Sequence, residues 1–268
     1  MRHIFSPQGI ERLRSVLERR PLLAFDFDGT LAPIVASPDA ARIAPNVERG
    51  LSELVERLPV AIVSGRDIAD VRARLGFDSP HIVVVGNHGA EFDLAGKAPA
   101  WLATIQAARE WLAPYRQELQ ALGVQVEDKR RSLALHYRRA SNRALAKQRL
   151  QAILSSTASD LSVFGGKLVF NIVAADAPDK ADAVRGLVKA TQSAAAIFVG
   201  DDVNDEPVFE SAPNHWLTIK VGRTSRRSKA HFYLGSPHEM NALLDHMLAV
   251  LDQGRRHSQA DQKNKNPK

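Results

Sequence analysis

The chain has 268 residues, of which 44% are hydrophobic and 25% charged, so it can bury a sizeable core in one or two domains. It contains no cysteine, which excludes disulfides, thiolate metal sites and cysteine nucleophiles. The formal net charge is +6, but most of this excess lies in residues 255–268, which we expect to be a basic disordered tail. A second basic run, residues 223–229, contains no aromatic side chains, so we expect no nucleic-acid partner.

The sequence gives no sign of membrane insertion. No stretch approaches the roughly 20 apolar residues that cross a bilayer, and the N-terminal segment lacks the apolar run of a secretory signal. We therefore expect a cytoplasmic protein with no membrane partner, and we expect it to be a monomer.

Short apolar segments alternate with amphipathic ones at both ends of the chain. Each apolar segment is followed by a cluster of polar residues, as at the end of a strand. This alternation is typical of an α/β fold with a doubly wound parallel sheet. The predicted strands are 22–25, 60–63, 82–85 and 196–199, and the predicted helices are 7–20, 46–58, 67–75 and 177–190.

Between the core segments 1–95 and 177–254 the pattern changes to that of a second domain, residues 96–176. Helix-like and strand-like stretches follow one another there as αββαββ, which predicts a small antiparallel sheet with both helices on one face. We expect this unit to be an inserted α+β cap domain. Its predicted elements are helix 101–122, hairpin 124–138, helix 142–155 and hairpin 161–173, with the second turn at Gly165-Gly166.

Two aspartates, Asp26 and Asp28, follow the first predicted strand in the string DFDGT. Carboxylates two residues apart on extended backbone point to the same side, at the strand end where open α/β sheets bind ligands. Their repulsion favours a hard cation such as Mg²⁺, with one carboxylate free to attack or to carry a proton. The alternative is an ordinary acidic turn, which Asp-Gly often forms.

A second acidic cluster follows the strand predicted at 196–199, in the string GDDVNDE. Asp201, Asp202, Asp205 and Glu206 would repel one another there unless a cation lay between them. Either acidic string alone could be a solvated loop. Two such strand ends in one parallel sheet imply a shared metal ion.

Two further motifs are less specific. Ser64, Gly65 and Arg66 follow the second predicted strand and could hold a phosphate oxygen with a hydroxyl and free backbone amides, although serine is also a common N-cap. Lys180 lies at the start of a predicted helix. It could stabilise charge on a nucleophile and a phosphoryl group, or it could be an ordinary surface residue.

Strand periodicity in the predicted cap divides its sheet into an apolar and a polar face. The apolar face should meet the helices. The polar face could simply be solvated, or it could hold a sugar phosphate beneath a lid, because it combines cations with hydrogen-bonding groups. It presents Glu127, Lys129, His136, Arg138, Lys167 and Asn171.

Four motifs of the chain resemble, in order, those of the haloacid dehalogenase (HAD) superfamily of phosphotransferases: DFDGT, SGR, a downstream lysine and GDDVNDE. The resemblance narrows to the trehalose-6-phosphate phosphatases because of three further strings, GNHGAE, VEDKRRSLALHYR and GGKLVFN. It covers most of residues 20–240. The resemblance implies a HAD-like core and Mg²⁺-dependent hydrolysis of trehalose 6-phosphate through an aspartyl phosphate, in trehalose biosynthesis.

The resemblance also implies roles for individual residues. Asp26 would be the nucleophile, and Asp28 would act as general acid and then as base. Mg²⁺ would be held by Asp26, the Asp28 carbonyl and Asp201, with support from Asp205 and Asp202. The phosphoryl group would be bound by Ser64 and Lys180. The sugar would be bound by Arg66, Asn87, His88 and the six polar cap residues.

The chain departs from the pattern of this family at several positions. Asn171 stands where glutamate is usual, and Asn204 where threonine is usual; Val173-Ala174 and Ala181 replace Arg-Pro and glycine. An amide can still bond a sugar hydroxyl, but without the charge that strengthens such a bond. The alternatives are therefore a phosphatase or phosphomutase of another sugar phosphate, or a binding protein on an inactive scaffold.

Overall fold

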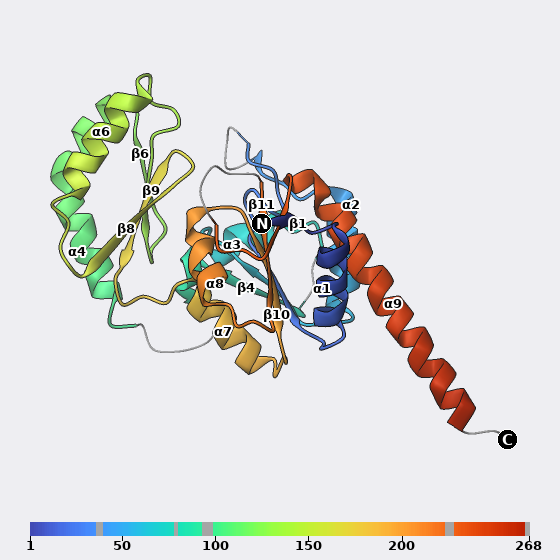
Figure 1. Cartoon of the computed structure of the whole chain (residues 1–268). Coiled ribbons are helices and arrows are strands. Elements are labelled where there is room, and N and C mark those ends of the chain that lie inside the picture. The colour runs from blue at the N-terminus through green and yellow to red at the C-terminus, as the bar shows by residue number, and fades with distance from the viewer. Residues whose placement is uncertain (36–39, 78–79, 93–98, 223–227, 266–268) are drawn as a thin grey trace.

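The computed structural model describes residues 1–265 apart from 36–39, 78–79, 93–98 and 223–227, and leaves aside the side chains of residue 255 and residues 257–265. The described chain forms two separate sheets, each with its own helices (Figure 1). Most of the basic run 223–229 lies outside the described residues.

The larger sheet has eight strands among the described residues, in the order β1-β12-β11-β10-β2-β3-β4-β5, all parallel except β5. Its central strands are apolar and fully buried, as strands covered by helices on both faces should be. Figure 1 shows α1, α2 and α9 over one face and α7 and α8 over the other. This arrangement confirms the predicted doubly wound core. The strands are β1 (Arg2–His3), β2 (Leu22–Phe25), β3 (Val60–Val63), β4 (Ile82–Gly86), β5 (Glu91–Phe92), β10 (Ala196–Gly200), β11 (Leu217–Val221) and β12 (Phe232–Leu234).

The helices of the core begin at defined capping residues. The side chains and backbone amides of Asp179 and Asp182 form a reciprocal capping box, so Lys180 is the first residue of α7, and its side chain is buried. Asp67 caps α3 in the same region of the core by accepting from the amide of Asp70. The core helices are α1 (Pro7–Leu17), α2 (Pro45–Val55), α3 (Ile68–Arg74), η2 (Asn87–Gly89), α7 (Lys180–Ala190), η4 (Val203–Asp205), α8 (Glu206–Ser211), η5 (Pro237–Glu239) and α9 (Met240–Lys265).

The smaller sheet is antiparallel, in the order β6-β7-β9-β8, and α4 and α6 lie on one of its faces (Figure 1). Leu133, Leu135 and Leu150 belong to a hydrophobic cluster distinct from the core of the larger sheet. The sheet therefore has a core of its own. Its elements are β6 (Gln125–Asp128), β7 (Leu133–His136), β8 (Leu161–Gly166), β9 (Val169–Ala174), α4 (Leu102–Leu112), η3 (Ala113–Tyr115), α5 (Arg116–Ala121) and α6 (Arg143–Leu154).

Two details of this unit differ from the prediction. The helical stretch 101–122 is divided by η3, because Pro114 has no amide hydrogen to continue an α-helix. The second hairpin turns at Lys167-Leu168 rather than at the two glycines, since Gly166 pairs with Val169. A Cβ at Gly166 would lie 3.2 Å from Oδ2 of Asp202. This glycine therefore permits close approach to the core instead of making a turn.

The C-terminal helix α9 extends further than the sequence indicates. The sequence predicts a disordered tail from Arg255, whereas α9 continues to Lys265 and projects away from the core (Figure 1). The stretch is rich in the good helix formers Gln, Arg, Lys and Ala, and no proline interrupts it before Pro267. Within the described residues, no helix has both the length and the apolar character needed to cross a membrane.

Candidate active site

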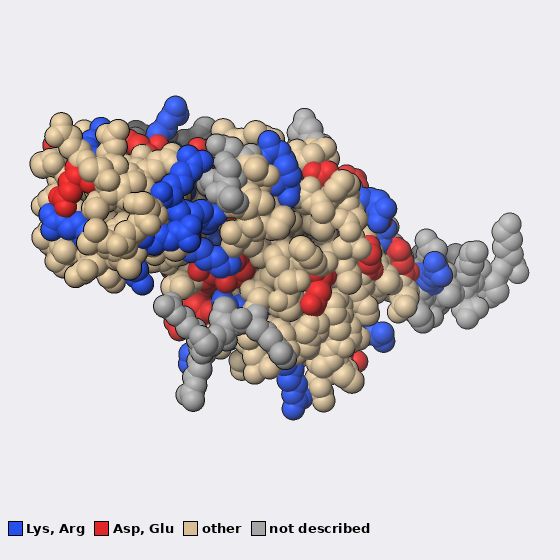
Figure 2. Space-filling model, turned by 90° about the horizontal axis from the view of Figure 1, so that it is seen from above, with Lys and Arg blue, Asp and Glu red and all other residues tan. Residues whose placement is uncertain are grey.

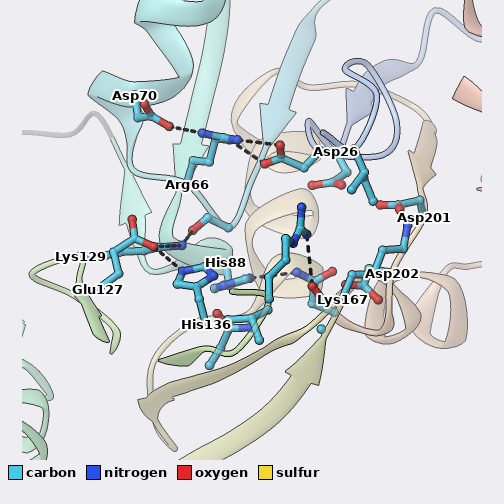
Figure 3. A pocket seen from close by; sticks show the side chains of 18 of the residues that line it. Asp26, Arg66, Asp70, His88, Glu127, Lys129, His136, Lys167, Asp201 and Asp202 are labelled. Atoms are coloured by element: carbon cyan, nitrogen blue, oxygen red, sulfur yellow. Dashed lines mark hydrogen bonds and ion pairs between the residues drawn. The ribbon is translucent and has the colours of Figure 1, made fainter. Parts of the chain in front are cut away.

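A cavity of about 300 Å³ lies between the C-terminal ends of the core strands and the polar face of the smaller sheet (Figure 3). All six polar residues predicted to share one face of that sheet line this cavity. Acidic and cationic side chains therefore meet across the boundary between the two units. The core contributes Asp26, Asp28, Arg66, His88, Asp201 and Asp202, and the smaller sheet contributes Glu127, Lys129, His136, Arg138, Lys167 and Asn171.

Asp26 and Asp205 share a buried lysine. Lys180 Nζ donates to Oδ1 of each carboxylate at 2.7 Å, and the lysine is only 1% exposed. Burial alone would lower the pKa of Lys180, but the two carboxylates raise it above its usual value, so the ammonium stays charged. Burial raises the pKa of Asp26 well above its usual range; Lys180 opposes that rise, while Asp205 and Asp201 add to it. Ionised Asp26 therefore needs further positive charge.

Asp201 has a buried carboxylate oxygen without a hydrogen-bond partner. It is 4% exposed, and its Oδ1 has no hydrogen-bond partner among the described residues. Burial, together with Asp205, raises its pKa to about 6. Oxygens of Asp26, Asp201 and Asp205 lie within 4.8 Å of one another. An all-oxygen set with an orphaned buried atom fits a hard divalent cation such as Mg²⁺.

Asp28 is held by an arginine that also binds a second aspartate. Arg66 donates from Nε and Nη2 to the two Asp28 oxygens, at 2.6 and 2.7 Å, and from Nη1 to Asp70 at 2.6 Å. Arg74 donates to the same Asp70 carboxylate. Burial opposes the charge of Arg66, but the bonds to Asp28 and Asp70 raise its pKa above the usual value. The arrangement fixes the orientation of Asp28, which lines the cavity together with Asp26. Figure 3 shows Arg66 and Asp70 linked at this side of the cavity.

Four residues predicted for the site lie behind the cavity wall instead of lining it: Ser64, Asn87, Lys180 and Asp205. Ser64 is fully buried, and its Oγ accepts from the backbone N–H of Arg66 at 3.1 Å. Asn87 is 1% exposed; it donates to Glu91 at 2.9 Å and accepts from the Ser132 hydroxyl at 2.8 Å. Ser64 therefore shapes the turn that carries Arg66, and Asn87 contacts the smaller sheet.

His88 occupies a tightly constrained place in η2. Its backbone is left-handed (φ 60°), and its ring packs edge-on against Phe164 with 5.0 Å between centroids. A Cβ at Gly65 would lie 2.3 Å from Cε1 of His88, so only glycine fits beside the ring. Burial lowers the pKa of His88 well below its usual value, and Lys129 and Lys180 add to the effect. The imidazole is therefore neutral.

The smaller sheet contacts the core through cations. Lys167 forms an ion pair with Oδ2 of Asp201, and Lys129 Nζ donates to the carbonyl of Gly65 at 2.9 Å. Figure 2 shows Lys and Arg side chains gathered where the smaller unit meets the core, next to acidic side chains. An anion entering the cavity would thus meet positive charge from one side and the carboxylate cluster from the other.

Comparisons with known proteins identify the family of this chain. A family model described as trehalose-phosphatase matches residues 24–238, which include both acidic strand ends. The chain belongs to the trehalose-phosphatase family. A trehalose-phosphate phosphatase of Mycobacterium bovis BCG is 32% identical over 249 residues, which cover 88% of this chain and 63% of that protein. The chain therefore spans somewhat less than two thirds of that relative.

Solved structures support the fold of this trehalose-phosphatase family member. The chain is similar to a trehalose-6-phosphate phosphatase related protein, with 25% identity and a TM-score of 0.68 over 86% of this chain and 99% of that one. The C-terminal domain of a Candida albicans trehalose-6-phosphate phosphatase has the same fold, with 23% identity and a TM-score of 0.74 over 90% and 96% of the two chains. The predicted family and HAD-like fold are thus confirmed.

Three residues of this family member contact the site although the sequence analysis assigns them no role in it. Asp70 binds Arg66, and its place four residues downstream on a helix start was the available signal. Asn204 contacts His88, which is distant in sequence and gives no local signal. Lys220, 4% exposed on β11, donates to the carbonyl of Asp201 at 3.2 Å and to Glu206 at 3.3 Å. A lysine within an apolar strand was the available sign of a buried counter-charge.

Proposed function

We propose that this chain is a Mg²⁺-dependent phosphatase that hydrolyses trehalose 6-phosphate to trehalose and phosphate. The observation that carries the proposal is the placement of Asp26. It lies at the C-terminal end of β2, lines the cavity and accepts a hydrogen bond from the buried ammonium of Lys180. It also shares a cluster of carboxylates with Asp201, whose Oδ1 has no hydrogen-bond partner among the described residues. A carboxylate so placed suits covalent attack on a phosphoryl group.

The metal would be held by Asp26, the backbone carbonyl of Asp28 and Asp201, with Asp205 supporting it. When bound, Mg²⁺ would offset the charge of the carboxylates and withdraw charge from the phosphoryl oxygens. Lys180 would hold one oxygen of Asp26 and one oxygen of Asp205 in place, since it donates a hydrogen bond of 2.7 Å to each.

The proposed reaction has two steps. An Asp26 oxygen forms a bond to phosphorus, the bond from phosphorus to the sugar oxygen breaks, and Asp28 gives that oxygen a proton. Asp28 then takes a proton from the water that attacks the aspartyl phosphate, which releases phosphate and restores Asp26. The contact with Arg66 positions Asp28, and one of its two hydrogen bonds must open before Asp28 can carry the proton that it gives to the leaving oxygen. Lys180 would stabilise the charge on Asp26 from behind the cavity wall, and Ser64 would act through the turn that carries Gly65 and Arg66.

Residues 96–176 would act as a cap that closes over the core formed by 1–95 and 177–254. The polar face of its sheet already reaches the cavity, and Lys129 and Lys167 contact the core directly. These cations, with Glu127, His136, Arg138 and Asn171, would bind the sugar phosphate. Arg66 and His88 would complete the sugar side from the core. The relatives named for trehalose phosphate favour that substrate.

Phosphate release from a panel of sugar phosphates, with Mg²⁺ and with EDTA, tests the proposal. We expect preference for trehalose 6-phosphate and loss of activity in EDTA. Asp26→Asn should abolish turnover, whereas Asp160→Asn, at an exposed site on the cap, should not change it. Metal-dependent release that favours another sugar phosphate would refute the substrate assignment, and turnover by Asp26→Asn near the wild-type rate would refute the mechanism.

A further inference from the structure

A second buried lysine, Lys220, lies behind the acidic loop that follows β10. It is on β11, beside Gly200 in the neighbouring strand, and is only 4% exposed. Its Nζ donates to the backbone carbonyl of Asp201 at 3.2 Å and to Oε1 of Glu206 at 3.3 Å. The described residues that line the cavity include neither Lys220 nor Glu206. Both residues therefore act on the protein and not on a substrate.

Glu206 belongs to this contact, although it is part of the acidic string GDDVNDE. The cluster of three carboxylates found among the described residues does not include it. Its Oε1 accepts from Lys220, and its Oε2 accepts from the Ser228 hydroxyl and from the backbone N–H of Lys229, each at 3.1 Å. Both oxygens are thus bonded, and Glu206 holds the ammonium of Lys220 in place beside the carbonyl of Asp201.

Lys220 completes the support of the peptide group between Asp201 and Asp202. At one end of this group the N–H of Asp202 donates to Oδ2 of Asp205 at 2.9 Å, and at the other end the carbonyl of Asp201 accepts from Lys220. The N–H of Asp201 donates to the same Asp205 oxygen at 2.8 Å. Because a peptide group is planar, bonds at both ends fix its tilt, and with it the direction in which the Asp201 side chain leaves the backbone.

The direction of the Asp201 side chain matters because its carboxylate has little room. A Cβ at Gly29 would lie 2.1 Å from Oδ2 of Asp201, so the carboxylate is packed against the backbone of the DFDGT turn. Its other oxygen, Oδ1, is the buried atom without a hydrogen-bond partner among the described residues. A rotation of the peptide group would shift that oxygen relative to Asp26 and Asp205, with which Asp201 forms the carboxylate cluster.

We propose that Lys220 and Glu206 are positioning residues for the metal, because they hold the carbonyl of Asp201 so that its carboxylate faces the cation. The inference rests on the proposed Mg²⁺ dependence and extends it to two residues outside the cavity wall. Loss of such an outer partner typically lowers metal affinity about ten- to hundredfold. If Lys220 only balanced charge, its removal would instead strengthen Mg²⁺ binding, since the site would become more negative. The two explanations predict opposite signs.

Calorimetric titration of the substrate-free protein with MgCl₂, at constant ionic strength, measures this sign. We expect Lys220→Met to raise Kd for Mg²⁺ about tenfold or more. Lys229→Met removes an exposed cation and should leave Kd nearly unchanged, because solvent and salt screen its charge. A Kd of Lys220→Met equal to or below that of the wild type would overturn this inference alone. Absence of Mg²⁺ binding by the wild type would overturn the proposed metal dependence, and this inference with it.

A charge-neutral double variant, Lys220→Met with Glu206→Gln, covers the case in which Lys220→Met alone does not fold. It leaves neither partner of the ion pair as an unpaired charge, and replacing both members of a buried pair is often neutral for stability. The amide oxygen at position 206 can still accept from Ser228 and Lys229. Net charge is that of the wild type, so a pure charge effect leaves Kd unchanged, whereas loss of the donor to Asp201 should still raise it about tenfold. An unchanged Kd in the folded double variant would refute the positioning role.

Discussion

Replacing Lys180 with methionine would remove the buried cation that Asp26 and Asp205 share, with little change in side-chain length. Loss of one partner from a buried ion pair lowers the free energy of unfolding by about 3–5 kcal/mol, because the remaining charge has no counter-charge in a poorly polarisable environment. Here Asp201 adds a third carboxylate, and all three lie within 4.8 Å of one another. We therefore expect the loss to fall in the upper part of that range at neutral pH.

The size of this loss should depend on pH. Burial raises the folded-state pKa of Asp26 well above its usual range and that of Asp201 to about 6. A carboxyl group with a raised folded pKa contributes stability that is complete below about pH 4, the pKa of unfolded aspartate, and that is lost as pH rises through the folded value. Lys180→Met removes the cation that limits this rise. The variant should thus be closest to wild type near pH 4 and furthest from it above pH 7.

Urea unfolding followed by circular dichroism, in EDTA at about pH 5 and about pH 7.5, measures the effect. Lys189→Met is the matched control, since Lys189 is exposed at the other end of α7, and it should change stability by less than about 0.5 kcal/mol. Added Mg²⁺ should restore part of the lost stability by binding the folded carboxylates. If Lys180→Met and Lys189→Met unfold at the same urea concentration at about pH 7.5, the charge argument is wrong.

Three kinetic predictions concern the groups around the cavity. Asp70→Asn should lower kcat about tenfold with little change in KM, because Arg66 loses the partner that orients it toward Asp28; a change confined to KM would contradict this. Lys167→Met should raise KM for trehalose 6-phosphate roughly tenfold or more, as loss of a charged hydrogen bond does, while Lys167→Arg keeps most of the affinity; equal KM values for both variants would count against a charge contact. In wild-type protein kcat/KM should fall with increasing salt, because cations at the cavity attract an anionic substrate, and Lys129→Gln should flatten that dependence; a rate insensitive to salt would argue against attraction at a distance.

The parts of the site that the sequence predicts depend on short-range patterns. Asp26, Ser64 and Asp201 each follow an apolar run, and parallel strands bring such ends to one edge of a sheet. The polar face of the cap follows from alternation along β6, β7 and β9. Both rules use spacing alone, so they work without knowledge of distant contacts.

The parts that the sequence does not predict depend on contacts between distant residues or on the local direction of a side chain. Asn204 meets His88 across 116 residues, and no periodic pattern encodes that distance. The sequence assigns Arg66 to the sugar but does not predict that its guanidinium also binds Asp28 and Asp70. Gly165 and Gly166 have the composition of a turn but lie within β8, and a Cβ at Gly166 would lie only 2.9 Å from Val169 and 3.2 Å from Asp202.

The ion pair between Lys167 and Asp201 joins the cap to a carboxylate that we assign to the metal site. One oxygen of Asp201 contacts the cap and the other has no partner, so a cation bound there competes with Lys167 for the same negative charge. Such competition is reciprocal: if Mg²⁺ weakens the hold of Asp201 on the cap, a closed cap weakens the affinity for Mg²⁺ by the same factor. If the phosphate of a substrate takes over the contact with Lys167, Mg²⁺ and Lys167 no longer compete for Asp201. Metal binding and cap closure would then favour the same closed state.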